Sequence, residues 1–224
     1  MSLILNIDTA VENASICLAK NGIAIETISN PDQKDHASWI HGAIQKLLTD
    51  GGYNISGLDA VAVSAGPGSY TGLRVGLSTA KGLCYALKIP LINIKTLLIM
   101  TFAAKEQAVE FICPMIDARR MEVFTAIYNK NMEEIIPAHA RIIDKDLFSE
   151  LLINHPIIFF GNGSGKFKSL VHSPNAEFPQ IETNASHLAD LSYHSFKNRD
   201  FADLAYSEPF YLKDFYSPVK KPIN

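Results

Sequence analysis

The order of apolar and amphipathic segments in the first hundred residues limits most strongly what this chain can fold into. Three apolar runs follow one another across short polar turns, which is typical of strands joined as hairpins. Two helical segments then alternate with two further apolar runs, and this needs crossover connections. The order predicts an α/β fold with a mixed sheet flanked by helices. The expected strands are residues 3–8, 14–19, 23–28, 58–64 and 91–94, and the expected helices are residues 35–50 and 71–88.

The strand pattern restarts after a helical stretch at residues 96–108, which indicates a second lobe. A length of 224 residues suits two compact lobes. We predict lobes of residues 1–100 and 101–224, divided within residues 97–109, with the irregular tail from Ser207 as a candidate to pack back on the first lobe. The later strands are expected at residues 111–116, 122–128, 134–137 and 156–160, and the later helices at residues 145–153 and 185–197.

The composition favours a folded, cytoplasmic protein without membrane contact that meets nucleic acid only indirectly. Hydrophobic residues make up 47% of the chain, and the formal net charge of −3 lacks the basic excess of a protein that grips RNA alone. The longest apolar run, residues 97–104, is far shorter than the ~20 residues that span a bilayer. The first residues show no signal-peptide pattern. Three separated cysteines are interpreted as small buried hydrophobes, namely Cys17, Cys84 and Cys113.

A glycine-rich segment, residues 66–76, is the strongest local signal in the chain. Its glycines permit backbone angles closed to other residues, and Thr71 is the expected N-cap of the helix that follows. Unpaired amides at such a helix start can hold an anion, but a tight turn without any ligand explains the same pattern. With an acidic side chain at the end of the first strand, the segment suggests a vestigial nucleotide site, made of Asp8, Thr9, Gly66, Gly68 and Ser69.

The two helices of the first lobe carry more apolar surface than one sheet requires. In residues 71–88, one stripe of larger residues suits the sheet, and a second stripe of mostly small residues would let another helix approach closely. In residues 35–50, apolar positions spread over a half-circle with the only tryptophan at one rim. The second neighbour is either another protein or part of the same chain. The candidate partner-facing residues are Trp39, Ile40, Ala43, Gly72, Arg74, Gly76, Thr79 and Leu83.

Two further patterns carry weaker signals. His36 and His41 are five residues apart, about 140° around one helix, so they do not close on one ion and no metal site is predicted. Residues 161–166 follow a strand as a phosphate loop would, but the glycine spacing is one residue short and Phe167 replaces the hydroxyl residue. We interpret this segment as a turn that makes at most a weak nucleotide contact.

Three segments together closely resemble the bacterial TsaB family in their residues, spacing and order, namely residues 4–10, 66–76 and 116–123. The resemblance covers essentially the whole chain. It implies an ASKHA fold of two lobes, the architecture of actin, Hsp70 and sugar kinases. It also implies a heterodimer with TsaD, a similar but catalytic subunit, through the two helices of the first lobe. An ATPase, TsaE, is implied to join the pair.

By this resemblance the chain is a non-catalytic subunit and not an enzyme by itself. TsaD transfers threonylcarbamoyl to N6 of adenosine 37 in transfer RNAs that read codons beginning with A, so transfer RNA is met through the complex. The TsaD family holds its metal with an HxxxH pair, and here His36 matches the first histidine while Ile40 stands at the second. No cofactor is expected beyond weak ATP or ADP binding. Two copies are expected to pair when TsaD is absent.

Two other functions stay open at this stage. An autonomous ATP-binding enzyme of the same fold would place Asp8 on magnesium and residues 66–69 on phosphate, and ATP hydrolysis by the isolated chain would favour it. A glycoprotease-like peptidase is the third alternative, and metal chelation or serine reagents would reveal it.

Overall fold

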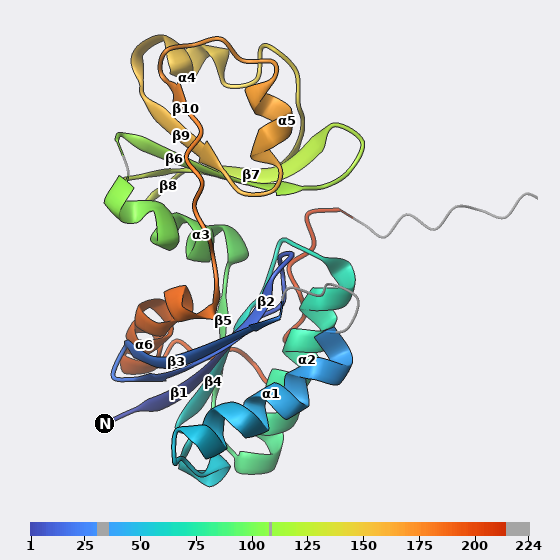
Figure 1. Ribbon diagram of the computed structural model, residues 1–224, viewed down its shortest axis with the longest axis vertical. Helices are drawn as coiled ribbons and strands as arrows, with labels where there is room; N and C mark the ends of the chain where they lie inside the picture. The colour runs from blue at the N-terminus through green and yellow to red at the C-terminus, as the bar shows by residue number, and fades with distance from the viewer. Residues whose placement is uncertain (31–35, 108, 214–224) are drawn as a thin grey trace, which may run out of the picture.

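A computed structural model describes residues 1–30, 36–107 and 109–213 of the chain. Figure 1 shows two sheets stacked along the long axis of the molecule, with helices on both and α3 (Thr96–Ala104) between them. Each sheet has five strands. The predicted α/β architecture with mixed sheets is confirmed.

The first sheet contains every strand predicted in the first hundred residues, in the order β3-β2-β1-β4-β5. The first three strands pair antiparallel, as hairpins require, whereas β1, β4 and β5 run parallel because helices connect them. Strands β1 and β4 are buried along their whole length, which explains their continuous apolar sequence. The strands are β1 (Leu3–Asp8), β2 (Ala14–Lys20), β3 (Ile23–Asn30), β4 (Ala60–Ser64) and β5 (Leu91–Ile94).

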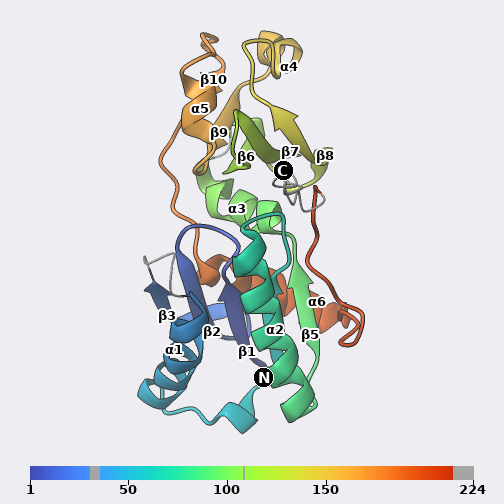
Figure 2. The ribbon, with the colours of Figure 1, turned by 90° about the vertical axis from the view of Figure 1, so that its right-hand side faces the viewer.

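Helices cover both faces of the first sheet. Figures 1 and 2 show α1 (His36–Asp50) and α2 (Tyr70–Leu87) side by side on one face, and α6 (Leu188–Asn198) on the other. Successive residues of a strand point to opposite faces. Leu5 accordingly belongs to the core under α1 and α2, and its neighbour Ile4 to the core under α6.

The second sheet has the order β10-β9-β6-β7-β8. One of its cores lies toward α3 and includes Leu97 and Met100 of that helix. The opposite core is rich in aromatic rings, with Phe159 and Phe167 packed edge to face at a centroid distance of 5.0 Å. The elements are β6 (Phe111–Asp117), β7 (Glu122–Asn129), β8 (Glu134–Ile142), α4 (Ser149–Asn154), β9 (Ile157–Phe160), α5 (Ser164–Lys168) and β10 (Ala176–Glu177).

Several predicted boundaries in the second half need correction. The α-helical part of residues 96–108 ends at Ala104 and continues as a 3₁₀ turn, Lys105–Gln107. Strand β8 runs past Pro137 to Ile142, because an edge strand tolerates a proline that cannot donate a ladder hydrogen bond. The helix expected at residues 145–153 begins only at Ser149, and the turn after β9 leads into the short α5. A 3₁₀ turn, Ala185–His187, precedes α6.

The chain returns to the first lobe after it has built the second. Helix α6 packs on the first sheet, and residues 200–213, which we name the C-terminal strap, follow it without helix or long strand. The strap pairs with β5, where the Ala202 amide donates to the Leu91 carbonyl at 2.8 Å. Lys81 of α2 then holds the carbonyls of Ala205 and Ser207. Figure 2 shows the strap rising beside β5 toward the second lobe.

The return of α6 rests on a buried polar contact that substitution can test. Ser192 Oγ donates to Asn6 Oδ1 at 2.7 Å, and both side chains are fully buried. In Ser192→Ala the amide oxygen of Asn6 loses this donor, so we expect a loss of about 1–3 kcal/mol in the free energy of urea unfolding. Ser195→Ala, on the same helix but only half-buried, is the control and should change stability by less than ~0.5 kcal/mol. Equal losses in the two variants would contradict the assigned role of the contact.

Candidate functional site

The glycine-rich segment makes a close-packed connection between β4 and α2. Gly66 has a φ of 113°, and a Cβ atom on it would lie 2.4 Å from the carbonyl oxygen of Phe210 in the strap. A Cβ atom on Gly68 would lie 2.3 Å from the carbonyl oxygen of Ala10. Both glycines therefore serve close approach of backbone segments within the chain.

The N-cap of α2 lies two residues earlier than predicted, and the helix begins at Tyr70. Ser69 is its N-cap and accepts a hydrogen bond from the Gly72 amide at 3.2 Å, so the prediction of Thr71 as N-cap is wrong. Thr71 lies in the first turn and is exposed. A cap at Ser69 already pairs one of the free amides that an anion would otherwise use.

The small residues of α2 pack on the first sheet rather than on a foreign helix. Thr9 Oγ1 donates to the Gly72 carbonyl at 2.7 Å. A Cβ atom on Gly72 would lie 1.9 Å from the Thr9 carbonyl oxygen, and one on Gly76 would lie 2.3 Å from Thr9 Oγ1. These glycines thus allow α2 to lie directly on the end of β1.

Burial corrects much of the predicted partner-facing set. The buried residues pack within their own lobe, and α1 and the first sheet supply the second neighbour that the pattern demanded. They are Ile40, Ala43, Gly72, Gly76 and Thr79. Arg74 is exposed, but its Nε donates to the Tyr211 hydroxyl of the strap at 3.1 Å.

The two remaining candidates, Trp39 and Leu83, are half-buried on different sides of the helix pair. Leu83 shares a groove of about 350 Å³ with His41, Leu48 and Tyr53. Trp39 and His41 lie about 160° apart around α1, so Trp39 occupies the rim away from α2 and packs against the first core. Of the two, Leu83 adjoins the groove between the helices.

Sequence reasoning missed the surface that α1 and α2 do present to solvent. Gly42 follows the buried Ile40 by two residues, and Gly82 follows the buried Ala80 in the same way, so both glycines point away from the core. Apart from the adjacent residues and the backbone of the same helix, no atom lies within 4 Å of a Cβ built on either glycine. We name this surface the outer helix face, and its exposed residues are Gly42, Gln45, Ser78, Gly82 and Ala86. In the sequence, the small residues Ser78, Gly82 and Ala86, spaced by four, were the signal that could have indicated this surface.

The structure places the five residues of the predicted nucleotide site at the adjoining ends of β1 and β4, but they differ in their access to the cleft. Asp8 and Thr9 are fully buried, and Gly66 lies beneath the strap. Only Gly68 and Ser69 line the cleft between the lobes. Burial raises the pKa of Asp8, and the nearby Ser64 hydroxyl, the Ala10 amide and His187 offset this only in part.

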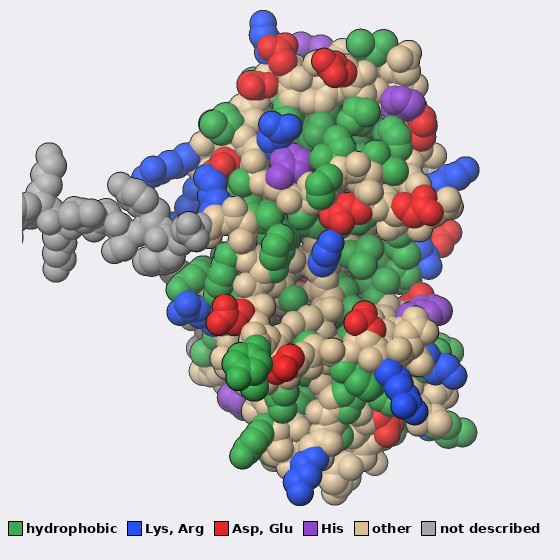
Figure 3. All heavy atoms as spheres, turned by 180° about the vertical axis from the view of Figure 1, so that it is seen from behind, with side chains coloured by type: hydrophobic (Ala, Val, Ile, Leu, Met, Phe, Trp, Pro, Cys, Tyr) green, Lys and Arg blue, Asp and Glu red, His purple; other side chains and the backbone are tan. Residues whose placement is uncertain are grey.

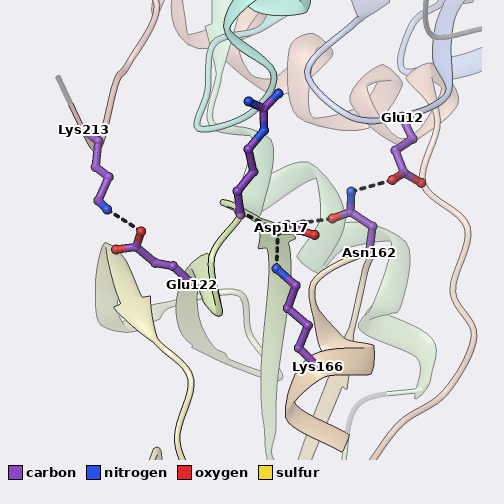
Figure 4. A network of polar contacts seen from close by, with 7 residues as sticks. Glu12, Asp117, Glu122, Asn162, Lys166 and Lys213 are labelled. Carbon is purple, nitrogen blue, oxygen red and sulfur yellow. Dashed lines mark hydrogen bonds and ion pairs between the residues drawn. The ribbon is translucent and has the colours of Figure 1, made fainter. Parts of the chain in front are cut away.

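The cleft between the lobes has a volume of about 680 Å³. Its first wall includes Ser69 and Tyr70 at the start of α2, and its second includes Asp117 at the end of β6 and Arg119 in the turn that follows. Figure 4 shows a polar network at its mouth, in which Lys166 donates to Asp117 and Asn162 joins Asp117 to Glu12. The charges beside the cleft are thus largely paired within the protein.

His36 and His41 lie in different environments, as their spacing predicts. His36 is buried beside the cleft, and His41 is exposed in the groove next to Leu83. Within residues 1–30, 36–107 and 109–213, no group of three His, Cys, Asp or Glu side chains is placed to hold a metal ion. In the same residues, no helix has both the length and the apolar character needed to cross a membrane.

Solved structures with the same fold support the two-lobed architecture. YeaZ from Pseudomonas aeruginosa superposes with a TM-score of 0.81 at 25% identity, over 95% of this chain and all of that one (100%). An activator of 2-hydroxyisocaproyl-CoA dehydratase from Clostridium difficile shares the fold at 9% identity, with a TM-score of 0.51 over 88% of this chain and 97% of its own. Two stacked mixed sheets around a cleft, flanked by helices, define the chain as an ASKHA-type protein.

Sequence comparisons identify the family within this class. A family model described as TsaD, tRNA N6-adenosine threonylcarbamoyltransferase, matches residues 24–214. The tRNA threonylcarbamoyladenosine biosynthesis protein TsaB of Bacillus subtilis is 30% identical over 216 residues, 94% of this chain and 93% of that protein. TsaB of Escherichia coli is 33% identical over 129 residues, which are 57% of this chain and 55% of the relative. The chain belongs to the TsaB family of tRNA threonylcarbamoyladenosine biosynthesis proteins.

Two glycines of α2 should respond in opposite directions to the same substitution. Gly76→Ala forces a methyl group against Thr9, so we expect a loss of about 1–3 kcal/mol in unfolding free energy. Gly82→Ala adds a methyl group in open space and removes backbone freedom, so a gain of about 0.5–1 kcal/mol is expected. Chemical denaturation of the wild type and both variants measures these changes in unfolding free energy. A neutral Gly76→Ala would contradict the contact between α2 and β1.

The buried Asp8 should reduce stability at neutral pH. Its pKa is raised on folding, so the folded chain binds more protons than the unfolded chain between the two pKa values, and stability falls as the pH rises through that window. Asp8→Asn removes this loss. Its unfolding free energy relative to the wild type should therefore be higher at neutral pH than below 3.8, the ordinary pKa of the group. A difference that does not change with pH would contradict a raised pKa.

Proposed function

We propose that this chain is a non-catalytic subunit that binds TsaD through the outer helix face and activates it. TsaD would then transfer threonylcarbamoyl to N6 of adenosine 37 in transfer RNAs that read codons beginning with A. The observation that carries the proposal is the open space above Gly42 and Gly82 on adjacent helices of a TsaB-family chain. Small residues let helices pack at short distances, as a partner of the same fold would do with its own helix pair.

The interior of the first lobe supports a role without catalysis. The carboxylate that would hold magnesium, Asp8, is buried without access to the cleft. Ile40, which stands at the second position of the HxxxH pattern, is also fully buried and offers no ligand atom. The phosphate-loop-like turn after β9 has its lysine, Lys166, paired with Asp117. Asp8 and Ile40 are thus enclosed by the fold, and the charge of Lys166 is already paired.

Contact with transfer RNA is proposed to be indirect. Figure 3 shows Lys and Arg side chains interspersed with Asp and Glu over both lobes of the face in view. The net charge of −3 gives no general attraction for phosphate. TsaE is proposed to join the assembled pair. In the absence of TsaD, two copies are proposed to associate through the outer helix face.

Arginine at Gly82 provides a test that leaves the monomer folded. The substitution places a long charged side chain in open space, so it should block a close helix contact without disturbing the core. We expect Gly82→Arg, and likewise Gly42→Arg, to weaken TsaD binding at least ~100-fold in titration calorimetry. Gly165→Arg is the matched control, because Gly165 lies in the second lobe with equally open surroundings, and it should bind as the wild type does. Wild-type affinity in both helix variants would refute this interface.

Reconstitution tests the function itself. With TsaC, which makes the adenylate donor, TsaD, TsaE and transfer RNA present, threonylcarbamoyladenosine should form only when this chain is added. The isolated chain should hydrolyse no ATP. Formation of the modified nucleoside without the chain, or ATP hydrolysis by the chain alone, would reject the role of a non-catalytic partner.

A further inference from the structure

Among the residues that the structure describes, three polar side-chain contacts join the two lobes. Asn162 Nδ2 donates to Glu12 Oε1 at 3.1 Å, between the turn after β9 and the loop after β1. Lys95 pairs with Glu134 at 3.0 Å. The third is an ion pair between Lys213 at the end of the strap and Glu122 at the start of β7. Figure 4 shows the first and third on opposite sides of Asp117.

The strap is held firmly on the first lobe before it reaches Lys213. The Phe210 amide donates to the Ala65 carbonyl at 2.7 Å, and the Phe210 carbonyl fills the space left by Gly66. The ring of Tyr211 packs against Tyr70 at a centroid distance of 5.3 Å with a tilt of 33°, and its hydroxyl accepts a hydrogen bond from Arg74. These contacts fix the position from which Lys213 reaches the second lobe.

The pair between Lys213 and Glu122 is the best shielded of the ion pairs that join the lobes. The side chain of Glu122 is 14% exposed, against 26% for Glu134 in the other pair. A shielded carboxylate gains more from its partner than an exposed one, because water screens it less. Loss of Lys213 would leave this carboxylate without its cation in a largely buried position.

We propose that Phe210–Lys213 form a latch that holds the second lobe closed over the cleft. The chain crosses between the lobes twice, after β5 at residue 95 and again at residues 178–185. These crossings overlap in the view of Figure 1 and stand apart in Figure 2, and Figure 1 shows the strap to one side of the line that joins them. Breaking the pair between Lys213 and Glu122 frees the lobes to rotate about the crossings. The cleft then opens on the side of the strap. The latch works in the isolated chain and does not depend on TsaD.

The distance between the lobes reports the state of the latch directly. Thr49 on α1 and Glu150 on α4 are exposed, so cysteines at these positions can carry spin labels. Burial raises the pKa of Cys84 to about 11 and of Cys113 to about 12, and Cys17 is also buried, so the native thiols should not react at neutral pH. Pulsed electron resonance then gives the distribution of interlobe distances in the full chain.

Charge reversal and its rescue distinguish a latch from a fortuitous contact. We expect Lys213→Glu to add a second, longer distance to the distribution measured between the two labels. The fraction of molecules with this longer distance should rise several-fold over the wild type. The double variant Lys213→Glu, Glu122→Lys should restore the wild-type distribution, and Lys46→Glu on the exposed side of α1 is the control that should change nothing. At about 1 M salt, where the screening length falls to about 3 Å, the wild type should open in the same direction.

Two outcomes would overturn the latch. One is an unchanged distance distribution in Lys213→Glu, and the other is a double variant as open as the single one although it is folded by circular dichroism. Should the Glu122 variant fail to fold, a chain truncated after Pro209 replaces it as the second test. That truncated chain must open at least as far as Lys213→Glu, and a closed distribution would reject the proposal.

Discussion

The contact between Thr9 and the first turns of α2 determines which residues of that helix are exposed on the surface of the first lobe. Because Gly72 and Gly76 carry no side chains, α2 lies directly on the end of β1, and the Thr9 hydroxyl joins the two elements. This contact sets the rotation of α2 about its own axis. Gly82 consequently points to solvent, and Arg74 points to the strap. A rotation of about 120° would exchange the stripe of Gly76 with that of Gly82.

Most of the first lobe could be predicted from the sequence, because its signals are local. Hairpin turns, buried apolar runs and a helix stopped by Pro90 each depend on a few neighbouring residues. The second half was harder because tertiary context decides its boundaries. Strand β8 continues through Pro137 only because it lies at a sheet edge, and α4 starts late, at Ser149. The return of α6 depends on contacts such as Ser192 with Asn6, which no local pattern reveals.

The candidate site shows where residue patterns become ambiguous. A stripe of small residues indicates close approach of another segment but does not identify that segment. For Gly72 and Gly76 the segment is β1 of the same chain. The neighbouring stripe with Gly82 has the same composition and stays open. The pattern around Asp8 is ambiguous in the same way. An acidic residue at the end of a strand can bind a ligand, but here the Asp8 side chain is buried by the chain itself. Burial, which only the fold reveals, separates the two cases.

The covering of the first sheet from the far end of the chain has a consequence for biosynthesis. The strands of this sheet are complete at Ile94, but before α6 is made its second face is covered only in part, by Leu98 and Ile99 of α3. During synthesis on the ribosome, part of this face of the first sheet therefore stays exposed to water until the second lobe has been synthesised. A translation product that ends before residue 185 would keep this apolar surface exposed, so it would be degraded and would not assemble. Only translation products that include α6 can complete the core of the first lobe.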